Sequence, residues 1–303
     1  MGRFFFYISF YLIFTQASFA KYDHVETRFE PHKRWLLNSK LEQQGLRNLL
    51  KTLIRSKTGK NLVRMANQKA KDSGLTLYDV IKPGNGSLTD TTLTRKFSTN
   101  NLEQVNYETV SLVFINKELN QYDALLDLAH ELTHYVYREG FNPYIANFTL
   151  KDFITNTIEG QGGEVQAFMT ECMIQKELFP YQRSGRYNCN NITDANSGKI
   201  SLQLAIQNFY KVGKYFDSFN SVLKEHGIRK FFPEISAQKA SFVSSAYGIP
   251  YPVAAFEEYL SVLNKACAND KKRLLYFKQQ KGRAPASVAQ VEKSYNSRCY
   301  SFN

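Results

Sequence analysis

Histidine, cysteine and tryptophan are scarce in this chain, whose 303 residues include five His, four Cys and one Trp. The cysteines show no C-x-x-C spacing, which argues against a cysteine-based zinc site. After residue 20 there is no segment long and apolar enough to cross a bilayer, so a transmembrane span is not expected there. Internal repeats and low-complexity linkers are also absent.

Aromatic and basic side chains, in contrast, are plentiful. Hydrophobic residues make up 43% of the chain, with 19 Tyr and 23 Phe, which supports a sizeable core and excludes a disordered chain. The formal net charge of +12 is compatible with an anionic envelope polymer as a partner. Because the charges are scattered, apart from short clusters such as 271–273, a solvated basic face is favoured, and no specific nucleic-acid partner is expected.

The first twenty residues, MGRFFFYISFYLIFTQASFA, differ from the rest of the chain. Arg3 supplies a positive start, residues 4–14 form an apolar run, and Ser18 and Ala20 are the small residues of a cleavage site. This pattern predicts a signal peptide over residues 1–20. We therefore expect an exported protein, periplasmic or secreted, with no transmembrane segment in its mature form.

The four cysteines all lie in the second half of the chain, and their number is even. In an exported protein this predicts two disulfide bonds. Proximity in the sequence favours Cys172–Cys189 and Cys267–Cys299, although four cysteines allow three pairings.

The hydrophobic pattern predicts a predominantly helical α+β fold. The best strand is 107–116, YETVSLVFIN, which is rich in β-branched and aromatic residues. A loop or irregular hairpin is expected over 83–100 and a loop near 141–155. Helices are expected over 35–54, about 59–72, 119–138, 163–178, 199–226 and 252–280.

The segment LLDLAHELTHYVYR, residues 125–138, contains the residues most suited to chemistry. On a helix, His130 and His134 are one turn apart and project from one face, so their ring nitrogens can bind the same ion. Glu131 lies about 100° around the axis, beside the ion, where it can accept a proton from water. The opposite face is apolar and is expected to pack into the core, through Leu125, Leu128, Leu132 and Tyr135.

The HELTH sequence resembles the HExxH signature of the zincin metallopeptidases, and it follows a strand as that fold requires. The resemblance implies a zincin-like core with a small sheet, an active-site helix and a glutamate helix. It also implies one zinc ion, a peptide or protein substrate, and Glu131 as general base for a metal-activated water. The strand 107–116 would then serve as an edge on which an extended peptide docks. We divide the chain into a mainly helical region, 21–100, and a catalytic domain, 101–303, whose C-terminal part is helical.

A catalytic zinc site needs a third protein ligand. The nearby third histidine of the metzincin branch is absent, and His24, His32 and His226 are remote in the sequence. The E-x-x-A sequence that begins at Glu164 resembles the gluzincin branch, and the preceding Gly162 and Gly163 would let its helix approach closely.

Other acidic residues compete for the role of third ligand. Glu171 is expected on the same helical face as Glu164, two turns on, and Glu159 precedes the glycines. Phe168 stands where some relatives have an aspartate that orients a histidine. Asp127, one turn before His130, could hold a ligating histidine in place or lie on the surface.

For stabilising the oxyanion we select Tyr247, in the turn-rich SSAYGIPYP, with Tyr251 and His226 as alternatives. Two other functions remain open. The chain could be a non-catalytic envelope-binding protein on a zincin scaffold, or a metal-dependent hydrolase of cell-wall peptides. The intact Glu131 argues against the binding protein, because binding needs no general base.

Overall fold

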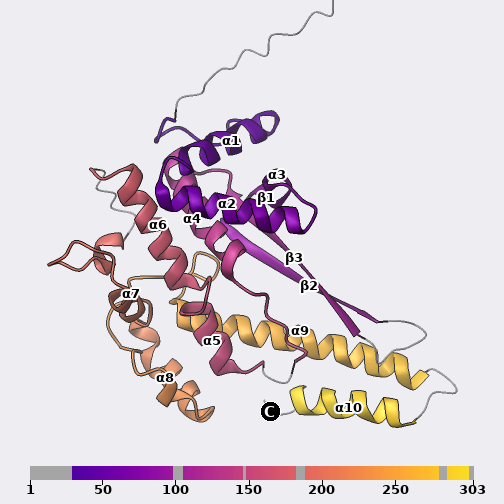
Figure 1. Cartoon of the computed structure of the whole chain (residues 1–303). Coiled ribbons are helices and arrows are strands. Elements are labelled where there is room, and N and C mark those ends of the chain that lie inside the picture. Colours follow the sequence, from indigo (N-terminus) through magenta and orange to yellow (C-terminus); the bar gives the residue numbers. More distant parts are fainter. Residues whose placement is uncertain (1–28, 98–104, 146–147, 182–187, 280–284, 300–303) are drawn as a thin grey trace, which may run out of the picture.

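The computed structural model describes residues 29–97, 105–145, 148–181, 188–279 and 285–299, so the predicted signal peptide lies outside the described residues. The fold is α+β and mostly helical, with one three-stranded sheet (Figure 1). In chain order the elements are α1 Glu42–Leu53, α2 Lys57–Asp72, α3 Leu77–Val80, β1 Ile81–Gly84, β2 Leu88–Phe97, β3 Val105–Asn116, α4 Gln121–Tyr137, α5 Leu150–Ile158, α6 Glu164–Leu178, α7 Leu202–Phe209, α8 Phe216–Glu225, α9 Tyr251–Gln279 and α10 Pro285–Cys299.

The sheet has the strand order β1-β3-β2, with β1 parallel and β2 antiparallel to β3. The predicted strand is therefore the central one among the described strands, with β1 and β2 as the outer strands, and the expectation that it is an edge is wrong over residues 113–116, where β1 pairs with it. Residues 88–97, expected in a loop or irregular hairpin, pair regularly with β3 along their whole length. Their threonines are β-branched, which favours a strand, and the Thr91 hydroxyl lies 3.0 Å from that of Ser111 on β3.

The inner end of the sheet is buried, and its outer end is exposed. Val113 and Ile115 of β3 are fully buried, whereas residues 106–110 are exposed. Figure 1 shows β2 and β3 extending away from the helical body with α9 alongside them. A contact between Arg95 of β2 and Asp270 of α9 holds the two together.

Helix α4 packs in the first of two hydrophobic clusters, together with α1, α2 and the buried ends of β1 and β3. The apolar stripe predicted from the sequence is confirmed, because Leu125, Leu128, Leu132 and Tyr135 are all buried. Trp35 joins the cluster and donates from its indole Nε1 to the carbonyl of Asn116, at 2.8 Å. This cluster contains residues from both sides of position 100.

The second cluster is aromatic and joins α5 to α9. Helix α6 lies between the clusters: Ile174 packs in the first, and Val165 and Phe168 pack in the second. The prediction of a loop near 141–155 is partly wrong, because α5 begins at Leu150. The Thr149 side chain caps α5 by accepting from the N–H of Asp152.

The predicted helix near 199–226 is two helices, α7 and α8. The chain turns between them at Gly213, whose φ of +56° is a left-handed conformation that interrupts a helix and favours glycine. The long helix predicted near 252–280 agrees with α9, Tyr251–Gln279.

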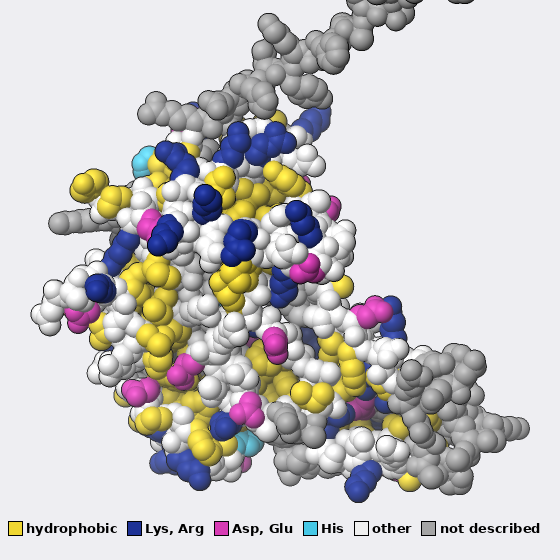
Figure 2. Space-filling model, viewed as in Figure 1, with side chains coloured by type: hydrophobic (Ala, Val, Ile, Leu, Met, Phe, Trp, Pro, Cys, Tyr) yellow, Lys and Arg dark blue, Asp and Glu magenta, His cyan; other side chains and the backbone are white. Residues whose placement is uncertain are grey.

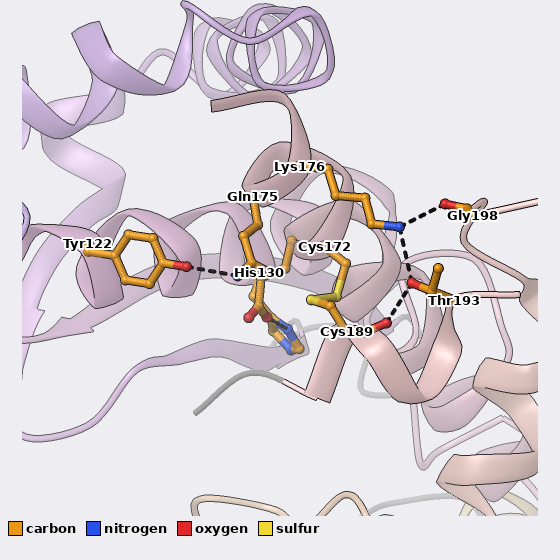
Figure 3. Close-up of a disulfide and its surroundings, with 9 residues drawn as sticks. Tyr122, His130, Cys172, Gln175, Lys176, Cys189, Thr193 and Gly198 are labelled. Carbon is orange, nitrogen blue, oxygen red and sulfur yellow. Dashed lines mark hydrogen bonds and ion pairs between the residues drawn. A yellow bond between two sulfur atoms is a disulfide. The ribbon is translucent and has the colours of Figure 1, made fainter. Parts of the chain in front are cut away.

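Both predicted disulfides are present, Cys172–Cys189 and Cys267–Cys299. Figure 3 shows the first, which joins α6 to the segment after it. The Lys176 ammonium reinforces this junction by donating to the Thr193 hydroxyl and the Gly198 carbonyl. The second disulfide joins α9 to α10.

Basic side chains are dispersed over the face seen in Figure 2, most densely over α1 and α2, and acidic side chains lie among them lower on the face. Within the described ranges, no helix combines the length and hydropathy that a membrane crossing requires.

Candidate metal centre

Two histidines of α4 and a glutamate of α6 meet at the centre of the molecule. His130 Nε2 lies 3.3 Å from one carboxylate oxygen of Glu164, and His134 Nε2 lies 3.4 Å from the other. The ligand atoms of these three side chains are all within 4.8 Å of one another. The three predicted ligands therefore form a group that could hold one metal ion.

The turn before α6 brings the carboxylate to the histidines. Gly162 has a φ of +68°, and a Cβ there would lie 2.3 Å from the backbone nitrogen of Arg138, so the position requires glycine. Its carbonyl is 2.7 Å from His134 Nδ1. Because a carbonyl can only accept, Nδ1 donates, so Nε2 is the ring nitrogen that faces Glu164 and could bind a metal ion.

His130 is oriented by Glu171, whose carboxylate oxygen Oε2 lies 3.2 Å from Nδ1. Glu171 is therefore placed behind a ligand, where it could orient the ring and strengthen its basicity. The seven-residue spacing from Glu164 predicted the correct face of α6 but not this role. Phe168 packs in the aromatic cluster.

Arg138 completes the surroundings of Glu164 and was missed by the sequence analysis. Its guanidinium lies 3.2 Å from Glu164 Oε1 and also donates to the carbonyls of Gly162 and Thr157. The sequence did contain a signal for this role. Arg138 comes one helical turn after His134, on the same helical face, at the end of α4.

The buried charges act strongly on one another. Burial raises the pKa of Glu164, but the charges of His134 and Arg138 and a hydrogen bond from His130 hold that pKa well below its usual value. Burial lowers the pKa of His130, but its contacts with Glu164 and Glu171 raise that pKa well above the usual range. Burial, opposed by His130, raises the pKa of Glu171 to about 7. The raised pKa of His130 shows that the surrounding carboxylates favour a positive charge at this position.

Glu131, the predicted general base, is buried beside this group. The Thr89 hydroxyl lies 2.8 Å from its carboxylate and 2.9 Å from its backbone carbonyl. Thr89 belongs to β2, so the edge strand passes directly beside the candidate base. This contact could not be predicted from the sequence, because it depends on how β2 pairs with β3.

Of the three groups considered for the oxyanion, the structure brings Tyr251 to the centre. Burial raises its pKa well above the usual value, and the charges of Glu164, Glu131 and Glu171 and a hydrogen bond to Glu164 raise it further. Tyr247, our choice from the sequence, is 45% exposed, and the acidic groups acting on its pKa are Glu258 and Glu257. The close approach of Tyr251 depends on where α9 begins, which only the fold determines.

The remaining candidates occupy different places. Glu159 accepts a hydrogen bond from the Tyr210 hydroxyl at 2.6 Å, which explains why it is not part of the metal group. His226 follows α8 and lines a separate cavity with Tyr259. Asp127 lines a cavity with His130, Glu131 and Glu171, so it belongs to the centre rather than to a remote surface.

That cavity has a volume of about 290 Å³ and reaches the face of His130. Its lining residues combine carboxylates, hydroxyls and aromatic rings: Ser87, Asp127, His130, Glu131, Phe168, Glu171, Phe209, Ser241, Phe242, Val243, Ser245 and Tyr251. A bound molecule could therefore reach His130 and Glu131 from this cavity.

Comparison of the chain with family models, curated proteins and solved structures found no match. The functional argument therefore depends on the chemistry of the centre itself.

Proposed function

We propose that the chain is an exported, zinc-dependent metallopeptidase of the zincin type, with a gluzincin-like ligand set. His130, His134 and Glu164 would hold one zinc ion, and Glu131 would be the general base. The observation that supports this most directly is the convergence of both Nε2 atoms on Glu164. The signal-peptide pattern and the two disulfides support export.

The donor set fits zinc. Two imidazoles and one carboxylate are a common catalytic zinc set, whereas calcium and magnesium prefer oxygen ligands. Donors about 2.0–2.2 Å from a tetrahedral zinc are roughly 3.3–3.6 Å apart. Each Nε2 lies at about that separation from one of the two Glu164 carboxylate oxygens, 3.3 Å for His130 and 3.4 Å for His134, and all three ligand atoms lie within 4.8 Å of one another. Both Nδ1 atoms also have the outer acceptors that fix zinc-binding histidines.

Zinc bound there would supply a Lewis acid that polarises a peptide carbonyl and acidifies water. Glu131 would accept the proton of the attacking water and deliver it to the leaving amine. The Thr89 hydroxyl would hold that carboxylate in position. Because its raised pKa keeps the phenol protonated, Tyr251 would donate a hydrogen bond to the developing oxyanion. An extended substrate could pair with the edge strand β2, beside Glu131.

The test is to compare the mature native protein with its Glu131→Gln variant. We expect about one zinc per chain in both and a loss of peptide hydrolysis of at least about hundredfold in the variant. Glu139→Gln is the matched control, because Glu139 is an exposed glutamate just after α4. It should retain both zinc and activity.

The peptide library should include cell-wall peptides, so that a cell-wall hydrolase is recognised by its substrate. A native protein that binds zinc but cuts no peptide would point to the envelope-binding protein instead. Equal activity of the native and Glu131→Gln proteins would contradict the proposed general base.

A further inference from the structure

The cavity beside His130 has an acidic lining. Asp127, Glu131 and Glu171 all line it, and His130 is the one basic side chain among the described residues that do so. The charges of Asp127 and Glu131 both raise the pKa of Glu171, which places the three carboxylates close together. Zinc with its Glu164 ligand would leave a net +1 charge, which the carboxylates of Asp127 and Glu131 alone outweigh.

Glu171 contributes an oxygen that lacks a partner. Its side chain is 6% exposed, and its oxygen Oε2 faces His130. The other oxygen, Oε1, is buried and has no hydrogen-bond partner among the described residues. An unpartnered buried carboxylate oxygen is costly, and Glu171 is one of the residues that line the cavity, so a cationic donor bound there would offset that cost.

Aromatic rings also line the cavity. Phe209 and Phe242 stack with their ring centroids 4.4 Å apart, and Phe168 meets Phe242 edge-on at 4.6 Å. Aromatic faces bind the aliphatic stem of a long side chain and attract a cation. The volume of about 290 Å³ suits one such side chain rather than a larger surface.

We propose that this cavity is a substrate pocket for an organic cation, an ammonium or guanidinium group beside the bond to be cut. Asp127 and Glu171 Oε1 would bind the cationic head, and the Phe168, Phe209 and Phe242 rings would contact the stem. This assignment rests on the proposed peptidase function, and it defines the substrate class as peptides with a positive charge next to the scissile bond.

The first test uses peptides that differ at one residue near the scissile bond, with lysine, uncharged norleucine or glutamate there. Each peptide is assayed with a free and with an acetylated N-terminus. We expect the kcat/KM ratio of lysine to norleucine to be at least about ten in the native protein. Preference that survives acetylation assigns the pocket to a side chain, and preference that requires the free amine assigns it to the N-terminus.

The variant Asp127→Asn should reduce the lysine-to-norleucine ratio about tenfold, whereas Asp127→Glu should retain part of it. Asp217→Asn is the matched control, since Asp217 is an exposed aspartate on α8 and should keep the native ratio. Equal use of lysine and norleucine by the native protein would overturn the pocket assignment. So would an undiminished lysine preference in Asp127→Asn.

A second test measures binding without hydrolysis, by titrating the zinc-loaded protein with N-acetyl-lysine methylamide and its norleucine analogue. Preferential binding of the lysine compound, weakened about tenfold by Asp127→Asn, is the expected result. If this binding occurs and no peptide is cut, the proposed peptidase is wrong and the cation pocket stands. If peptides are cut but neither the rates nor the binding favour lysine, the pocket is wrong and the peptidase stands.

Discussion

Two buried carboxylates in this molecule, Glu164 and Asp270, both contact basic side chains, but the types of base differ. The Glu164 side chain is 11% exposed and contacts His130, His134 and Arg138. The Asp270 side chain is 5% exposed and contacts Arg95, at 2.6 Å, and Arg298. A guanidinium keeps its protons, so the Asp270 group is a closed ion-pair network. An imidazole can exchange its proton for a metal ion, so the Glu164 group can open to a cation.

The wider surroundings reinforce that contrast. Both guanidiniums at Asp270 also lie over the ring of Tyr144, with Arg95 3.8 Å from its centroid, and these contacts join β2, α9 and α10. Both groups also have a disulfide nearby: Cys172 follows Glu171, and Cys299 follows Arg298. The type of base that faces the carboxylate therefore separates a structural clamp from a candidate metal centre.

The largest expected effect is that of Asp270→Asn, which breaks the clamp. It leaves two largely buried guanidiniums without their counter-charge, so we expect the free energy of unfolding to fall by about 3–5 kcal/mol. Zinc affinity should be unchanged. Glu164→Gln should show the reverse pattern, a large loss of zinc affinity with a smaller loss of stability in the metal-free protein.

Urea unfolding and metal titration of both variants measure these effects. Loss of zinc binding in Asp270→Asn would show that the two groups are coupled rather than independent.

The next largest effects are expected from removing the disulfide beside each of the two carboxylate groups. Replacing Cys267 and Cys299 by alanine should lower the free energy of unfolding by about 3–4 kcal/mol, since the bond closes a loop of sequence separation 32. Zinc affinity should be retained. Replacing Cys172 and Cys189 should cost about 3 kcal/mol and also weaken zinc binding, because Cys172 adjoins Glu171.

Thermal unfolding and chelator competition distinguish the two double variants. Equal zinc affinities in the two would contradict the link between Cys172 and the centre.

The parts of the centre that are local in sequence could be predicted. Helical spacing placed His130 and His134 on one face and the leucine stripe on the other, and the structure has both features. Glu164 was found because its spacing and the preceding glycines matched a family pattern. Thr89 could not be found, and Tyr251 could be named only as an alternative to Tyr247, because they approach from β2 and α9 and no sequence period links them to α4.

The same division applies to the fold. Strand 107–116 and the helices around 130 and 170 are marked by strong periodicity and by end signals. The position of β3 in the sheet could not be predicted, because it depends on pairing with residues 88–97, whose threonines also suit a loop. The break at Gly213 was overlooked, because a single glycine is tolerated in many helices.

A smaller effect is expected from Glu171→Gln. The amide oxygen can still accept from His130 Nδ1, but the negative charge that strengthens the imidazole is lost. We expect zinc affinity to fall by about 10–100-fold, which is typical for residues behind a metal ligand. Glu159→Gln is the control, since Glu159 binds Tyr210 instead, and its zinc affinity should be native. Equal affinities in the two variants would remove the orienting role of Glu171.

The smallest expected effect is a gradual change of the protein's stability with pH. The raised pKa values of His130 and Glu171 mean that the metal-free folded state holds these protons more tightly than the unfolded state. Their contribution to stability is complete at low pH and declines as the pH rises. The contribution of Glu171 is lost between about pH 4.5 and about pH 7, and that of His130 is lost beyond neutrality.

Zinc binding must follow the opposite trend, because zinc displaces the His130 proton. Its affinity should rise about tenfold per pH unit for each proton displaced, over the range in which His130 is protonated. Thermal unfolding of the metal-free and zinc-loaded proteins between about pH 6 and about pH 8 should therefore give stabilities that diverge with pH. Parallel curves would mean that no proton leaves when zinc enters, and then His130 would not be a ligand.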